Sequence, residues 1–172
     1  TPAEEGGSGK VYMVRAGLFN DVDIVLHWHP DDQNSANIAT NNSNKSAKFL
    51  FKGISTHAAG APDMGRSALD GVESMNMMVN MLREHIPQES RIHYVITKGG
   101  LAPNVIPDVA EVYYYVRHPR REKVNEIFNW VVKTSEGAAM GTETTVTHEV
   151  MHGNYSKLPN QTLQKIMYKN LV

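Results

Sequence analysis

The sequence of 172 residues contains no cysteine, and its formal net charge at pH 7 is only −1. The absence of cysteine excludes disulfide bonds and leaves histidine and carboxylate side chains as the available metal ligands. A nearly neutral chain offers no basic surface of the kind that binds nucleic acid. No apolar run approaches the roughly 20 residues that span a bilayer. Neither nucleic acid nor a membrane is therefore an expected partner.

The chain also lacks an initiating methionine, and no charged-then-apolar leader opens it. It begins TPAEEGGSGK, as if it were cut from the interior of a longer protein. The lack of cysteine and of a secretion signal fits a cytoplasmic protein. The length allows one domain, or one domain with pieces of another.

The order of elements is clearest in the middle of the chain. Residues 31–47 are rich in Asn and Ser, which predicts a loop and the best domain boundary. After a short helix near 10–19, and beyond this loop, the periodicity predicts strands near 48–54, 91–97, 109–117 and 143–151, and helices near 65–84 and 120–139. The order β-α-β-β-α-β predicts an α+β, ferredoxin-like fold, with a four-stranded antiparallel sheet and both helices on one face.

Side-chain periodicity also predicts which residues face the core of this fold. In the strand near 109–117, one apolar set alternates with a polar and aromatic set: Ala110, Val112, Tyr114 and Val116 against Glu111, Tyr113, Tyr115 and Arg117. The first helix carries a methionine cluster, which is core filler or a packing surface: Met75, Met77, Met78 and Met81.

His57 lies where the strand near 48–54 passes into the following helix, within the small and polar stretch ISTHAAG. Residues of this size do not shield an imidazole, so His57 can be presented to another molecule. An ordinary half-exposed loop histidine explains the same pattern equally well.

Two other groups carry side chains of the metal-ligand type. Glu4 and Glu5 precede a glycine cluster, and they are either a solvated pair or carboxylates at a strand end from which the glycines turn the chain. The apolar run 24–26 predicts a short buried strand that ends at His27 and His29. In an extended chain both imidazoles point to one side and can hold a divalent metal. In the alternative, one histidine packs and the other is solvated.

The chain resembles the two-metal aminoacylase and carboxypeptidase family, and within it the amidohydrolase branch, through four motifs in the same order: TPAEEGG, GLFNDVDIVLHWHP, FKGISTHAAGAPDMGRSALD and GGLAPNVIPDVAEVYYYVRHP. The resemblance implies that residues 48–151 are a lid, or dimerisation, domain inserted in a zinc-peptidase-like α/β catalytic domain. Residues 1–47 and 152–172 are then flanking pieces of that catalytic domain. The implied activity is cleavage of the amide of N-acyl amino acids, aminobenzoyl-glutamate among them.

The same resemblance implies roles for three residues of the first segment. Glu4 corresponds to the general base that takes a proton from a metal-bound water. Glu5 and His29 correspond to ligands of a divalent metal ion, zinc or manganese, which lowers the pKa of that water. The resemblance gives His27 no role.

In the lid, His57 corresponds to the histidine that each subunit of a homodimer donates to its partner's active site, where it stabilises the developing oxyanion. Asn104 and Arg117 correspond to residues that hold the substrate's carboxylate. A guanidinium is suited to this task because it pairs with a carboxylate through two parallel hydrogen bonds.

The family needs further metal ligands upstream of Glu4 and Glu5, and one more histidine well after the lid, and this sequence has none of them. His148 and His152 do not match that late ligand. We therefore expect the chain by itself to be an inactive fragment of a metal-dependent hydrolase. The alternative from another class is a self-contained ferredoxin-like module for binding or oligomerisation, without catalysis.

Overall fold

The structure, a computed structural model, describes residues 8–171. Its four strands and its helices follow one another along the chain as α1 (Gly9–Arg15), β1 (Ser43–Lys52), the 3-10 helix η1 (Pro62–Met64), α2 (Ala68–Leu82), the 3-10 helix η2 (Arg83–His85), β2 (Arg91–Lys98), β3 (Val109–His118), α3 (Arg121–Gly141), β4 (Thr145–Asn154) and α4 (Gln161–Lys169). None of the helices in this described part of the chain is long and apolar enough to cross a bilayer.

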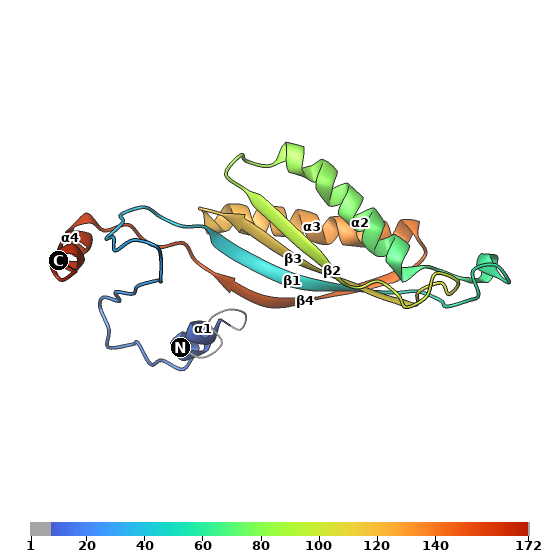
Figure 1. Ribbon diagram of the computed structural model, residues 1–172, viewed down its shortest axis with the longest axis horizontal. Helices are drawn as coiled ribbons and strands as arrows, with labels where there is room; N and C mark the ends of the chain where they lie inside the picture. The colour runs from blue at the N-terminus through green and yellow to red at the C-terminus, as the bar shows by residue number, and fades with distance from the viewer. Residues whose placement is uncertain (1–7, 172) are drawn as a thin grey trace.

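The four strands form one antiparallel sheet in the order β2-β3-β1-β4. Helices α2 and α3 lie side by side on one face of it, and the opposite face carries no helix (Figure 1). We call this uncovered side the outer face. The sequence prediction of a ferredoxin-like sheet with both helices on one face is confirmed.

The hydrophobic core lies between the sheet and the two helices. Alternate residues of the central strands are fully buried, among them Phe49 and Phe51 of β1 and Tyr114 of β3. They pack against the inner stripe of each helix, whose buried members are Val72, Met75, Val79, Val124, Ile127 and Val131. The alternation expected for the strand near 109–117 is confirmed, because Ala110, Val112, Tyr114 and Val116 are buried and their neighbours in sequence are not.

The loop prediction was wrong for residues 43–47, which form the first half of β1. Their Asn and Ser content suggested a loop, but β1 is hydrogen-bonded on both sides, to β3 and to β4. Ser43, Ser46 and Ala47 are fully buried there, since small side chains fit a crowded central strand. Tertiary pairing thus overrides the local preference of the polar residues.

The predicted buried strand at 24–26 was also wrong in this structure. The segment is irregular, and Val25 is 64% exposed. No strand of the described residues pairs with it, so its apolar side chains have nothing to pack against. The helix expected near 10–19 is shorter than predicted and ends at Arg15.

A buried polar contact ties α2 to β3. The hydroxyl of Tyr114 donates a hydrogen bond of 2.5 Å to Oδ1 of Asn76. Both side chains are buried, and Tyr114 also stacks on Tyr94 with ring centroids 5.1 Å apart. Burial raises the pKa of Tyr114 far above its usual range, so the phenol remains a donor.

We expect Tyr114→Phe to lower the free energy of unfolding by about 1–3 kcal/mol, because it leaves the buried Asn76 amide without its donor. Urea unfolding of the purified chain measures this loss. Tyr155→Phe is the control, since Tyr155 is 76% exposed and should change stability by less than about 0.5 kcal/mol. Equal losses in the two variants would contradict a stabilising role for the Tyr114–Asn76 contact.

Candidate functional site

His57 lies in the loop after β1, at the end of the sheet farthest from α1 and α4 (Figure 1). A second loop, residues 99–108 between β2 and β3, runs beside it. The two are joined by an isolated bridge between His57 and Val105, in which the backbone N–H of Ala58 donates to the carbonyl of Asn104 at 2.9 Å. The structure therefore brings His57 and Asn104 together, and we call these paired loops the tip.

The His57 imidazole is exposed and held in one orientation. Its Nδ1 accepts hydrogen bonds from the backbone N–H groups of Ala59 (3.2 Å) and Gly60 (3.1 Å). With Nδ1 occupied as an acceptor, a neutral imidazole carries its proton on Nε2. The ring thus presents a hydrogen-bond donor at the tip, which is the group that a developing oxyanion requires.

The tip is anchored to the body of the fold at Gly53 and Arg66. Ile54 and Arg66 form an isolated bridge, and Arg66 Nε donates to the carboxylate of Glu143 at 2.5 Å. A Cβ atom at Gly53 would lie only 1.9 Å from the backbone oxygen of Arg66. Glycine is therefore required at the point where β1 leads into the tip.

Arg117 is not close to His57 and Asn104. It is near the far end of β3, which begins at Val109 just after the Asn104 loop. At about 3.4 Å per residue, Val109 and Arg117 are separated by roughly 27 Å of strand. Figure 1 shows the end of β3 on the side of α1 and α4, opposite the tip. The three lid residues predicted from the sequence thus occupy two separate places in one chain.

Around Arg117 the structure adds residues that the sequence analysis did not assign. The guanidinium carbon lies 5.5 Å from the ring centroid of Tyr115, and the Tyr115 hydroxyl is 2.9 Å from Nε2 of His152. Tyr113 and Ser46 continue this contact along the outer face, through oxygen pairs at 3.4 and 3.3 Å. The alternation along β3 put Tyr115 and Arg117 on one face, but the partner from β4 had no signal in the sequence.

The predicted metal-binding residues do not come together among the described residues. Glu4 and Glu5 lie outside them. His27 and His29 are exposed in irregular chain, and His29 Nδ1 contacts the Pro30 carbonyl oxygen at 2.8 Å. Within residues 8–171 no group of three or more His, Asp or Glu side chains is arranged to hold a metal ion. This part of the chain does not by itself fit a metal.

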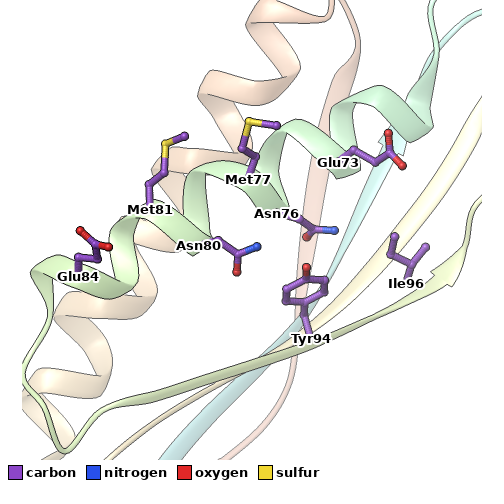
Figure 2. Close-up of a pocket in the computed structure, with 8 residues that line it drawn as sticks. All are labelled: Glu73, Asn76, Met77, Asn80, Met81, Glu84, Tyr94 and Ile96. Carbon is purple, nitrogen blue, oxygen red and sulfur yellow. The ribbon is translucent and has the colours of Figure 1, made fainter.

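A groove of about 680 Å³ runs between α2 and the edge strand β2. In Figure 2, the side chains of Asn76 and Asn80 point toward Tyr94 of β2, and those of Met77 and Met81 point away from it. Met77 and Met81 are 62% and 63% exposed. Of the methionine cluster only Met75 is core filler, and the others form an open apolar surface beside an unpaired strand edge.

Comparison with known proteins gives a family for the sheet and its helices. The sequence profile of the peptidase dimerisation domain M20_dimer matches residues 39–142. Over 99% of its length, this chain is 47% identical to one of the two subunits of the p-aminobenzoyl-glutamate hydrolase of Escherichia coli, and it covers 36% of that relative. It is 33% identical to the Xaa-Arg dipeptidase of Mus musculus, with 95% of this chain and 38% of the relative covered.

Solved structures support the same fold. An aminobenzoyl-glutamate utilization protein from Klebsiella pneumoniae superimposes with a TM-score of 0.69 at 20% identity, covering 91% of this chain and 41% of that one. A hydantoinase/carbamoylase family amidase from Burkholderia multivorans gives a TM-score of 0.66 at 15% identity, covering 76% and 32%. The chain spans little more than a third of the length of the curated relatives it matches.

We expect Gly53→Ala to loosen the tip, because the added Cβ meets the Arg66 backbone. The free energy of unfolding should fall by about 1–3 kcal/mol, and the Ala58 and Ile106 amides, which bond across the tip, should exchange faster. Hydrogen exchange with urea unfolding measures both. Gly137→Ala in α3 is the control: its Cβ has room, and alanine favours a helix, so stability should hold or rise. Slower or unchanged exchange in Gly53→Ala would remove the tip anchor assigned to Gly53.

Proposed function

Because the chain belongs to the family defined by the M20 peptidase dimerisation domain, we propose that it is the lid of a metal-dependent amidohydrolase, with flanking pieces of the catalytic domain. The substrate class is N-acyl amino acids, aminobenzoyl-glutamate among them, and the chain alone is inactive. The flanking pieces are residues 1–47 and 152–172. The observation that carries the proposal is an exposed His57 held at the tip with its donor nitrogen facing outward.

The separation of the two lid positions implies that one active site takes residues from two subunits. Roughly 27 Å of rigid strand is longer than an N-acyl amino acid. His57 and Arg117 of the same chain therefore act at different sites. In a homodimer, the tip of one subunit and Arg117 of the other complete each site.

Two features favour this assignment of tip and strand end. The segments that flank the sheet leave it at the Arg117 end, beside the start of β1 and the end of β4, so the catalytic domain of the same subunit lies there (Figure 1). The tip points the other way, and it exposes four large apolar side chains: Ile54, Met64, Leu101 and Val105. Exposed apolar groups at a protruding loop pair are suited to burial against a partner.

Each lid residue then has a chemical task. The Nε2–H of His57 donates to the oxygen that becomes negative as the amide carbon is attacked. Asn104, whose backbone is bonded to the His57 loop, places its amide beside the same site. Arg117 of the other subunit pairs with the α-carboxylate of the substrate, and its stacking on Tyr115 sets the plane of the guanidinium.

The metal-dependent part of the reaction belongs to the catalytic domain. A bound zinc or manganese supplies the hydroxide that attacks the amide. By family resemblance, Glu5 and His29 are two of its ligands and Glu4 is the general base. Since the described residues do not bring a ligand set together, the remaining ligands would come from other parts of a longer hydrolase.

The dimer surface that we propose is the edge of β2 with the outer side of α2. Within the described residues β2 pairs only with β3, so its other edge keeps unpaired backbone groups. Apolar side chains flank that edge, with Val95 56% exposed and Met81 63% exposed. A second copy can add its own β2 to this edge and cover the methionines.

Mixed dimers test the shared site directly. In the full-length enzyme, we expect His57→Ala and Arg117→Ala each to lower kcat/KM for an N-acyl amino acid by at least about 100-fold. Dimers formed from both variants contain one site with an intact His57 and an intact Arg117. Co-refolding the two variants should thus restore about a quarter of wild-type activity, since half of the dimers are mixed and one of their two sites is complete. No recovery on mixing, with both variants folded and dimeric, would overturn the two-subunit site.

We expect Met81→Glu to convert the dimer to monomer or to raise its dissociation constant by at least about 10-fold, because it places a charge in the apolar surface beside β2. Light scattering coupled to size exclusion gives the mass. The matched control is Met140→Glu in α3, which is 79% exposed and outside the proposed surface. A dimer that tolerates Met81→Glu as well as Met140→Glu would place the interface elsewhere.

A further inference from the structure

The outer face of the sheet is rich in basic groups at the end where β3 finishes. Arg91 of β2 is the direct partner of Arg117 in the β2–β3 register, and His93 is the partner of Tyr115. Directly opposed residues of an antiparallel pair share one face, with Cα atoms about 4.5–5.5 Å apart. His152 reaches the same place from β4. We call Arg91, His93, Arg117 and His152 the basic corner.

The positive charge of this corner is not neutralised by protein carboxylates. Among the described residues, the ion pairs involve neither Arg91 nor Arg117. Arg117 Nε is buried without a hydrogen-bond partner in this part of the chain. The nearest acid along β3, Glu111, lies toward the other end of the strand and is engaged by Lys48 (3.5 Å) and Thr97 (2.8 Å).

The histidines of the corner register the same field. Burial lowers the pKa of His93, and the neighbouring Arg117, Arg83 and Arg91 lower it further. Burial and Arg117 lower the pKa of His152. Both imidazoles are therefore held neutral at neutral pH, and the two guanidinium groups carry the charge of the outer face.

The two guanidinium groups are held in different ways. Arg91 Nη1 donates to the backbone carbonyls of Gln88 and Ser90, both at 2.7 Å, which fixes the group near the start of β2. Arg117 rests on the Tyr115 ring, which His152 holds through its hydroxyl. Two positioned forks on neighbouring strands match a ligand with two carboxylates joined by a short carbon chain.

We propose that the basic corner selects an acidic amino acid on the leaving side of the substrate. Arg117 takes the α-carboxylate, and Arg91 takes the side-chain carboxylate of glutamate or aspartate. This inference rests on the amidohydrolase function proposed above, and it assigns Arg91 a specificity role that Arg117 alone cannot supply. A neutral side chain loses the second pair, and a cationic side chain is repelled by Arg91.

Kinetics of the full-length enzyme test the specificity. For Arg91→Gln, KM for an N-acyl-glutamate should rise about 10- to 100-fold with kcat nearly unchanged. KM for the matching N-acyl-glutamine should change less than about 2-fold. Lys133→Gln on α3 is the charge-matched control and should leave both constants at their wild-type values. An equal change for both substrates, or no change for either, would overturn the role of Arg91.

A binding measurement separates this inference from the proposed function. Calorimetry of the same full-length protein with free L-glutamate and free L-glutamine does not require turnover. Wild type should bind glutamate at least about 10-fold more tightly than glutamine, and Arg91→Gln should abolish that preference. If no N-acyl amino acid is hydrolysed but the preference and its loss are seen, only the proposed reaction fails. If hydrolysis occurs and glutamate is not preferred, only the basic corner fails.

Discussion

The alternation of side chains along β3 is the constraint on which the rest of the structure depends. Its even-numbered residues, Tyr114 among them, enter the core beneath α2 and α3, and its odd-numbered residues face outward. The same strand therefore both supports the fold and displays Tyr115 and Arg117. A shift of one residue in register would bury the guanidinium and expose the core, so packing on one face fixes the chemistry of the other.

The length of that strand has a second consequence. Because β3 is paired on both sides, it behaves as a rigid spacer between the tip and Arg117. Residues that resemble one family's active-site set are thus kept apart in each subunit. Association of two subunits becomes a requirement of the chemistry, since it is the dimer that brings an imidazole from one chain to a guanidinium of the other.

The order and type of the elements from β1 to β4 were predictable from sequence, because periods of 2 and 3.6 are strong where one face is buried. Residues 43–47 were missed because their polar composition hid a buried central strand. The run 24–26 was misassigned because its apolar residues have no strand beside them among the described residues. Within the site, the nearness of His57 to Asn104 follows from backbone pairing between two loops, which no local pattern encodes. The contact between Tyr115 and His152 likewise depends on the placement of β4 two strands away from β3.

Strand β2 connects the two proposals about specificity and assembly. Its residues at 91 and 93 face outward beside Arg117, while Tyr94 and Ile96 line the groove under α2, and its free edge is the surface proposed for the second subunit. An edge strand held only on one side is the least restrained part of a sheet. Pairing with a partner would restrain it, and with it the position of Arg91. In this arrangement, dimerisation supplies the missing tip and also stiffens the strand that discriminates between substrates. Relatives named for aminobenzoyl-glutamate and for Xaa-Arg dipeptides can then share one lid while differing in the charge that this strand presents.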